Sequence, residues 1–144
     1  MIAPLPQHAA GCGFTPGNSI VHCNGALMRA HCRDGTTIVK VTGEIDATNV
    51  DRFSDYARRF VGEAQGLILD LSGVDFLCAR GISVLVAIDD ECRTAGIRWA
   101  IVASPTVKRL LHLVDMSDAL PSVSSERQAL KVAALQGHRQ LAVL

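Results

Sequence analysis

Residues 66–71 have the sequence Gly-Leu-Ile-Leu-Asp-Leu, a short apolar run interrupted only by Asp70. An apolar run of this length without polar alternation is typical of a strand that is covered on both faces. We therefore predict a strand over residues 66–71 in the middle of a sheet.

Apolar residues at helical spacing occur on both sides of this strand. The stripe before it contains Val50, Phe53, Ala57, Phe60 and Val61. Thr48 followed by Asp51 resembles a capping pair, which predicts that this helix is entered at Thr48. The stripe after the strand contains Leu85, Ile88, Cys92 and Ala95. It predicts a helix over residues 80–95 that stops at Gly96.

The remaining segments continue the alternation of strands and helices. Residues 98–103 are predicted as a strand, and Ser104 and Pro105 as the cap and first turn of the next helix. The buried face of that helix is predicted to contain Val107, Leu110, Leu111 and Val114. Ser125 with Gln128 predicts the start of a last helix that ends near residue 135.

Two β-rich runs near the N-terminus, residues 26–33 and 36–41, flank Asp34 and Gly35. Gly accepts the positive φ of a tight turn, so this pattern predicts a hairpin. Strands alternating with helices favour parallel pairing elsewhere in the sheet. The predicted fold class is therefore α/β, with a mixed, mainly parallel sheet, an N-terminal antiparallel hairpin and about four helices.

The chain has 144 residues, of which 49% are hydrophobic and 19% charged, and its 14 Lys and Arg balance 14 Asp and Glu. This size and composition predict one packed domain. A net charge of zero disfavours direct binding to nucleic acid. The most apolar window, residues 82–88, is far shorter than the roughly 20 residues that cross a bilayer, and residues 1–14 lack a signal-peptide pattern. We therefore expect a cytoplasmic chain with no transmembrane segment.

No nucleophile, phosphate-loop, dinucleotide or zinc-protease motif occurs in the sequence, so we predict neither an enzyme nor a bound cofactor. The dipeptides His22-Cys23 and His31-Cys32 would point their side chains to opposite faces of a strand, so we predict no metal site. The five cysteines are odd in number and form no CxxC motif, which favours reduced thiols.

Cys78 and Cys92 differ in their predicted surroundings. A helix between them would separate them by roughly 20 Å, too far for a disulfide. Cys92 falls on the apolar stripe, whereas Cys78 lies in the loop before the helix, where amide dipoles and Arg80 favour a thiolate. Cys78 is therefore a candidate redox residue.

Four motifs occur in one order along the chain: Gly43-Glu-Ile-Asp-Ala-Thr-Asn-Val50, Leu69-Asp-Leu-Ser-Gly-Val-Asp-Phe76, Ala79-Arg-Gly-Ile-Ser83 and Ser104-Pro-Thr-Val-Lys-Arg-Leu110. Together they closely resemble the STAS domain of bacterial anti-sigma factor antagonists, over residues 26–136. The resemblance implies a STAS fold. It leaves residues 1–25 as an N-terminal extension that is flexible in part, and residues 137–144 as a C-terminal tail.

The resemblance also implies a non-enzymatic protein-interaction module that regulates transcription. Such a protein binds an anti-sigma factor with a histidine-kinase-like ATPase domain and so releases a sigma factor. Phosphorylation of a serine before a glycine, at the start of a helix, ends that binding. Here Arg80 occupies the phosphoserine position and Cys78 that of a preceding Asp. Arg has no hydroxyl group, so we expect no switch by phosphorylation at position 80.

Partner-binding residues implied by the resemblance are Asp46, Thr48, Arg80, Gly81 and Ser83. Asp46 matches the acidic residue of the Gly-Glu-Ile-Asp motif in the family, and it is equally well explained as a cap of the helix entered at Thr48. Ser83 is an alternative phosphosite, because it lies three residues after Arg80 on the same helical face.

Two other functions remain open from the sequence. The loop of Cys78 and Arg80 is also compatible with a ligand- or redox-sensing STAS protein. The family further includes STAS subunits of lipid-transport assemblies. The sequence leaves a homodimer open as well.

Overall fold

The computed structural model describes residues 20–62 and 65–133. The expectations for the N-terminal arm before residue 20, including Cys12, and for the C-terminal tail 137–144 lie outside these residues. The elements in chain order are β1 (Val21–Cys23), β2 (Ala26–Arg33), β3 (Thr36–Ile45), α1 (Val50–Arg59), β4 (Gly66–Leu77), α2 (Ala79–Ala95), β5 (Arg98–Ala103), α3 (Pro105–Leu113) and β6 (Ser122–Val123). Residues 126–133 form a further helical segment.

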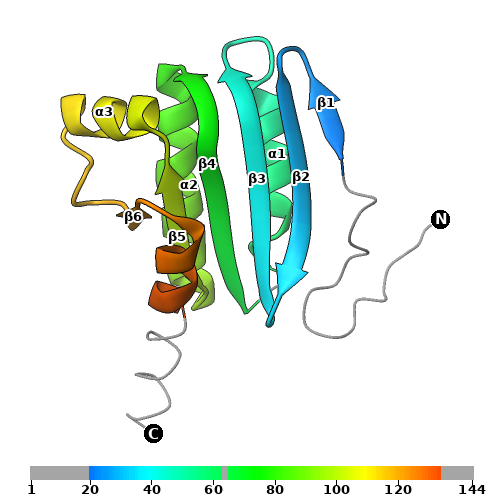
Figure 1. Ribbon diagram of the computed structural model, residues 1–144, viewed down its shortest axis with the longest axis vertical. Helices are drawn as coiled ribbons and strands as arrows, with labels where there is room; N and C mark the ends of the chain where they lie inside the picture. Colours follow the sequence, from blue (N-terminus) through cyan, green and yellow to red (C-terminus); the bar gives the residue numbers. More distant parts are fainter. Residues whose placement is uncertain (1–19, 63–64, 134–144) are drawn as a thin grey trace, which may run out of the picture.

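The strands form one six-stranded sheet in the order β1-β2-β3-β4-β5-β6 (Figure 1). Strands β1, β2 and β3 pair antiparallel, and β3, β4, β5 and β6 pair parallel. The predicted mixed sheet with an antiparallel N-terminal edge is therefore confirmed. Strand β1 was not predicted.

Strand β4 is the predicted central strand, and it extends beyond the apolar run to Leu77. Its side chains alternate between two hydrophobic clusters, because successive residues of a strand point to opposite faces. Leu67 and Leu69 pack in the larger cluster with the stripes of α1 and α2, whereas Ile68 packs in the smaller one with Ala129 of the last helical segment. Helices α1 and α2 thus cover one face of the sheet, and residues 126–133 cover part of the other (Figure 1).

The turns have the backbone that their residues predict. Asp34 and Gly35 both have positive φ, 52° and 83°, as a two-residue hairpin turn requires. Asn24 and Gly25 form a second such turn, with φ of 38° and 93°, between β1 and β2. The N-terminal edge is therefore two consecutive hairpins.

Two of the three predicted helix caps are confirmed. Ser104 Oγ accepts a hydrogen bond from Val107 N at 3.1 Å, and Ser125 Oγ accepts one from Gln128 N at 3.2 Å. The predicted entry at Thr48 is wrong, because α1 begins at Val50 and Asn49 occupies the N-cap position. On α3, Val107 and Leu111 are buried as predicted, but Val114 ends the helix and is 47% exposed.

Candidate functional site at the carboxyl ends of β3 and β4

The ends of β3 and β4 bring together the two loops that the sequence analysis singled out. Ile45 pairs with Leu77 in parallel register, and Cys78 N donates to Ile45 O at 2.9 Å. Asp46 follows Ile45, so this hydrogen bond places Asp46 close to Cys78, at the end of the sheet from which the chain continues into α1 and α2. In α/β sheets, binding sites lie preferentially at this carboxyl edge. We call it the carboxyl-edge surface, formed by Asp46, Thr48, Phe76, Arg80 and Ser83.

Asp46 and Thr48 form a closed turn before α1. Asp46 Oδ1 accepts hydrogen bonds from Thr48 Oγ1 at 2.6 Å and from Thr48 N at 2.9 Å. These two bonds, the hydroxyl contributing most, hold the pKa of Asp46 below its ordinary value. Asp46 therefore caps a turn and not the helix itself, and it presents an ionised carboxylate at the edge of the sheet.

Asn49 is a buried residue that the sequence analysis did not identify. Its side chain is 1% exposed, and its amide nitrogen donates to the carbonyl oxygens of Cys23, Asn24 and Glu44 at 2.9 to 3.0 Å. Its Oδ1 accepts from Asp46 N at 2.9 Å. Asn49 thus ties the β1–β2 turn and the end of β3 to the start of α1, which positions Asp46.

Arg80 lies in the first turn of α2 and forms an ion pair with Asp51 in the first turn of α1. Arg80 Nη2 lies 2.5 Å from Asp51 Oδ1. A cation at a helix N-terminus is electrostatically unfavourable, and α2 has no acidic residue in its first turn. The stability of α2 alone therefore does not explain the presence of arginine at this position. Asp51 supplies the counter-charge from the neighbouring helix.

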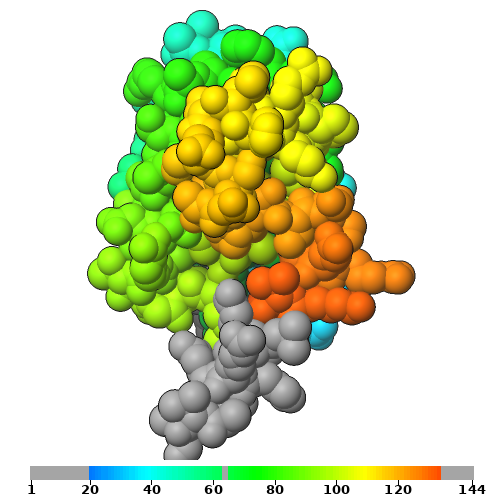
Figure 2. All heavy atoms as spheres, turned by 90° about the vertical axis from the view of Figure 1, so that its left-hand side faces the viewer, coloured from blue at the N-terminus to red at the C-terminus, as the bar shows by residue number. Residues whose placement is uncertain are grey.

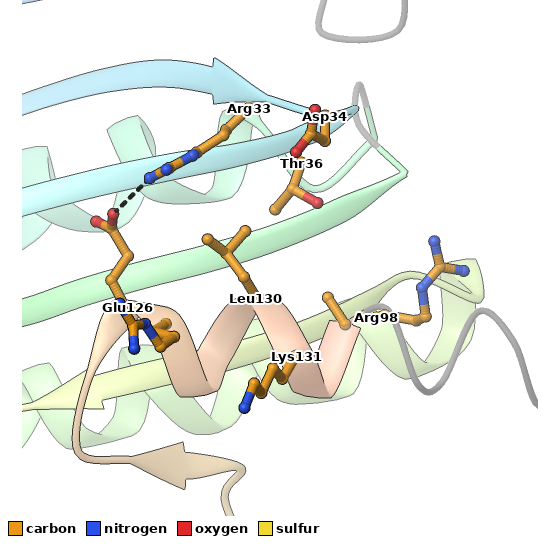
Figure 3. A pocket seen from close by; sticks show the side chains of 9 residues that line it. Arg33, Asp34, Thr36, Arg98, Glu126, Leu130 and Lys131 are labelled. Atoms are coloured by element: carbon orange, nitrogen blue, oxygen red, sulfur yellow. Dashed lines mark hydrogen bonds and ion pairs between the residues drawn. The ribbon is translucent and has the colours of Figure 1, made fainter.

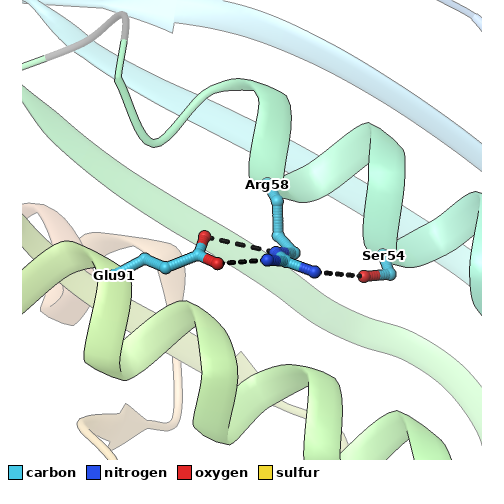
Figure 4. Close-up of polar contacts among 3 residues, drawn as sticks. All are labelled: Ser54, Arg58 and Glu91. Atoms are coloured by element: carbon cyan, nitrogen blue, oxygen red, sulfur yellow. Dashed lines mark hydrogen bonds and ion pairs between the residues drawn. The ribbon is translucent and has the colours of Figure 1, made fainter.

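A second polar contact joins α1 and α2 farther along both helices (Figure 4). Arg58 Nε donates to Glu91 Oε1 at 3.2 Å, its Nη2 contacts Glu91 Oε2, and its Nη1 donates to Ser54 Oγ at 3.4 Å. The two-pronged contact fixes the planar guanidinium group. Polar contacts thus join helices α1 and α2 at two points.

Gly81 and Ser83 have different environments although both were predicted to bind a partner. Gly81 is buried, and a Cβ there would lie 2.4 Å from Leu77 Cδ1 and 3.7 Å from Ile45 Cγ2. Gly81 therefore allows α2 to pack closely against the ends of β3 and β4. Ser83 is exposed on α2.

Phe76 adds an apolar group to the same edge. It is 48% exposed, although strand alternation from buried Val74 would bury it. The register changes between Gly43↔Val74 and Glu44↔Phe76, which leaves Asp75 as an extra residue. Such a bulge turns Phe76 outward and Leu77 inward. The sequence alone does not signal this bulge.

The cysteines in the described part of the chain differ in accessibility. Cys92 is fully buried, and burial, together with Asp89 and Glu91, raises the pKa of its thiol to about 12. Burial also raises the pKa of Cys23. Cys78 is a half-buried free thiol at the N-cap position of α2. Cys32 is disulfide-bonded, so the expectation of reduced thiols is wrong for this residue.

Among residues 20–62 and 65–133, no group of three His, Cys, Asp or Glu side chains is arranged to hold a metal ion. The same described ranges contain no helix that is long and apolar enough to cross a membrane.

Comparison with known proteins defines the class to which this arrangement belongs. The STAS domain family matches residues 15–129, and the chain is a member of that family. The chain is 41% identical over 109 residues to Osmosensory protein A of Mycobacterium tuberculosis, a match that covers 74% of this chain and 69% of that protein. It is 28% identical over 101 residues to the anti-sigma-F factor antagonist RsfA of the same species, covering 67% and 79% of the two chains.

A solved structure has the same fold. The crystal structure of an anti-sigma factor antagonist from Mycobacterium paratuberculosis superimposes with a TM-score of 0.70 at 24% identity, covering 84% of this chain and 99% of that chain. The resemblance to the STAS fold that the four sequence motifs indicated is therefore confirmed.

Proposed function

We propose that this protein is an anti-sigma factor antagonist that binds an anti-sigma factor and so releases a sigma factor. The observation that carries the proposal is the carboxyl-edge surface, where the loop of Asp46 and the N-terminus of α2 meet. Relatives that are named anti-sigma factor antagonists support the same function. Binding, and not catalysis, is the activity in this proposal.

The chemistry of the surface suits a protein partner. An ionised carboxylate at Asp46 and a guanidinium group at Arg80 supply charges that orient a partner, and the exposed ring of Phe76 supplies apolar area. Aromatic and arginine side chains are enriched among the residues that dominate binding energies at interfaces. The proposed partner is an anti-sigma factor with a histidine-kinase-like ATPase domain.

We further propose that this antagonist is not regulated by phosphorylation at position 80. Arg80 has no hydroxyl group, and its positive charge imitates neither a neutral serine nor a phosphate group. Arg80 is instead paired with a carboxylate of the protein itself, that of Asp51. The protein is therefore proposed to bind its partner without being released by phosphorylation at position 80.

Binding assays with purified anti-sigma factors of the same organism test the proposal. The wild-type chain is expected to bind at least one of them and to restore transcription by the sigma factor that it holds. Asp46→Ala, Arg80→Ala and Phe76→Ala are each expected to weaken binding at least about fivefold, as truncation of an important interface residue does.

Arg93→Ala is the matched control, because Arg93 is also an exposed arginine of α2 and is paired with a carboxylate, that of Asp89. This variant is expected to bind like the wild type. If no anti-sigma factor binds, or if Arg93→Ala weakens binding as much as Arg80→Ala does, the proposed function or its location is wrong.

A further inference from the structure

The face of the sheet opposite α1 and α2 is uncovered over β2. Met28 and Ala30 pack in the larger hydrophobic cluster with α1 and α2, so the residues that alternate with them point to the other face. On that face, the helical segment 126–133 packs in the smaller cluster with buried residues of β3, β4 and β5. Figure 2 shows this segment and α2 on opposite sides of the molecule. In Figure 1, where this face is toward the viewer, none of the described elements lies in front of β2.

Arg29 of β2 and Lys40 of β3 lie side by side on this uncovered face. They are partners in the antiparallel register, and paired residues of neighbouring strands point to the same face. The Cβ atoms of such a pair are about 5 Å apart, so both charged groups can reach one point between them. Arg29 is exposed and Lys40 is half-buried. The next pair on the same face, Leu27 and Thr42, is half-buried as well.

The pairing of Arg29 with Lys40 is unfavourable for the fold itself. Like charges directly opposite each other on neighbouring strands are destabilising. Within residues 20–62 and 65–133, neither side chain takes part in an ion pair. The stability of the sheet therefore does not explain two cations at these positions, and an anionic partner would relieve their repulsion.

Asp70 lies on the same face, as the β4 partner of Lys40. It is only 3% exposed, and its Oδ1 accepts hydrogen bonds from Ser72 Oγ at 2.6 Å and from Ser72 N at 3.0 Å. This carboxylate is thus engaged by Ser72, and it is not in ion-pair contact with Lys40.

Two further carboxylates lie at the far end of β2, beside Arg33. Glu126 Oε1 lies 3.5 Å from Arg33 Nη1 (Figure 3), and Asp34 follows Arg33 in the turn. Arg33 is roughly 14 Å from Arg29 along the strand. These carboxylates therefore offset the charge of Arg33 and leave Arg29 without a close counter-charge.

We infer that Arg29 and Lys40 bind an acidic side chain of a partner protein, with its carboxylate between the guanidinium and ammonium groups. A guanidinium group donates two parallel hydrogen bonds to a carboxylate, and an ammonium group adds a compact charge beside it. This surface goes beyond the proposed function. Lys40 lies roughly 20 Å along β3 from Asp46, so the carboxyl-edge surface stays free.

The number of cations favours a protein over a membrane or a nucleic acid. Basic clusters that recognise anionic lipids contain about 4–8 Lys and Arg residues, and DNA-binding proteins contact on the order of 6–10 phosphates. In the described part of the chain, β2 and β3 together carry Arg29, Arg33 and Lys40. A protein interface needs only a few charged contacts, because surrounding side chains such as Leu27 exclude water from them.

Titration of the full chain with a capped peptide of alternating glutamate and threonine, followed by amide NMR, tests the inference. The amides of Arg29, Lys40 and Thr42 are expected to shift saturably, and a matched peptide of alternating glutamine and threonine is expected not to shift them. Arg29→Gln and Lys40→Gln are each expected to raise the dissociation constant about two- to fivefold, the range for an exposed ion pair, and the double variant about tenfold. Each single variant should remain folded, because it removes a repulsion.

Arg52→Gln is the matched control. Arg52 is also an exposed arginine, but it lies on α1, which covers the other face of the sheet. This variant is expected to bind the glutamate peptide like the wild type. The inference is overturned if the glutamate peptide shifts no amide of β2 or β3, if the glutamine peptide produces the same shifts, or if Arg52→Gln weakens binding as much as Arg29→Gln. Wild-type mapping decides the matter even if Lys40→Gln fails to fold.

Other anionic partners are tested on the same residues. Phosphatidylcholine vesicles with and without phosphatidylserine, and a single-stranded DNA oligonucleotide, are added at equal ionic strength. If either anion binds the wild type more tightly than the glutamate peptide does, and Arg29→Gln abolishes that binding, the inference of a protein partner is overturned. Binding of an anti-sigma factor by Arg29→Gln is measured in parallel, so failure of this inference and failure of the proposed function remain distinguishable.

Discussion

Arg80 Nη2 and Asp51 Oδ1 lie 2.5 Å apart and join the first turns of α2 and α1 across 29 positions of sequence. The two side chains are 62% and 78% exposed. Exposed pairs of this kind contribute at most about 1 kcal/mol to stability. Arg80 thus lies on a surface where a partner can reach its charge, and its replacement is expected to change the stability of the fold little.

Phosphorylation at position 80 should require that Arg80 be replaced by a residue with a hydroxyl group. The wild-type chain, incubated with a compatible kinase and ATP, is expected to gain no phosphate at position 80. A triple variant, Cys78→Asp with Ala79→Ser and Arg80→Ser, is expected to accept one, because the N-terminus of α2 stabilises the added negative charge. Intact mass measurement and peptide mapping check both outcomes. A stoichiometric phosphate on Ser83 of the wild type would instead show a displaced phosphosite.

Removal of the Asn49 side chain should destabilise the protein strongly. Asn49→Ala leaves the carbonyl groups of Cys23 and Glu44 without this donor, so we expect a loss of about 2–4 kcal/mol in the free energy of unfolding. Urea denaturation measures it. Thr48→Ala is the control, because Thr48 is exposed, and it should cost less than about 1 kcal/mol. An Asn49→Ala variant as stable as Thr48→Ala would show that the buried hydrogen bonds contribute little.

A methyl group at position 81 should be harder to accommodate than one at an open glycine. Gly81→Ala places a Cβ 2.4 Å from Leu77 Cδ1, so we expect a net loss of about 1–2 kcal/mol after the gain in helix propensity. Gly62→Ala is the control, since nothing lies within 4 Å of a Cβ there. Thermal denaturation compares the two variants. Equal stability would mean that Leu77 moves aside at no cost.

The Thr48 hydroxyl should govern the titration of Asp46. In the folded protein the pKa of Asp46 is held below 3.8, so this carboxylate stabilises the fold at higher pH, and the contribution is lost as the pH falls through the lowered value. Thr48→Val removes the hydroxyl but keeps the backbone donor, so the pKa should rise without fully reaching 3.8. Carboxyl NMR titration measures this shift. Thr94→Val, an exposed change on α2, should leave it unaltered, and no rise in Thr48→Val would refute the assignment.

Alkylation should distinguish Cys78, at the N-cap of α2, from Cys92, inside the same helix. Cys78 is half-buried, whereas Cys92 is fully buried and its pKa is raised to about 12, which suppresses the reactive thiolate. We expect Cys78 to be modified faster in the folded protein at neutral pH, as followed by peptide mapping over time. If Cys78 reacts no faster than Cys92, a redox role for the α2 loop has no physical basis. Labelling after denaturation should remove the difference.

Local patterns predicted most of the elements because each pattern depends on neighbours within a few residues. The pair Ser104-Pro105 predicted the start of α3 correctly. The apolar run at residues 66–71 predicted a strand that in fact continues to Leu77, and the stripe from Val50 to Val61 predicted a helix that ends at Arg59. Asn24-Gly25 is an equally local turn signal, and it would have predicted β1 as well. These signals need no knowledge of the rest of the fold.

Only the tertiary structure decided the features that join distant segments. The carbonyl partners of Asn49 lie up to 26 positions away, and Asp51 lies 29 positions from Arg80. The outward turn of Phe76 follows from a bulge that exists only when β4 pairs with β3. The pairing of Arg29 with Lys40 likewise depends on the register of β2 and β3. Periodicity determines which face of an element is buried, but it contains no information about which distant residue lies opposite, because strand register and helix docking are set by packing of the whole chain.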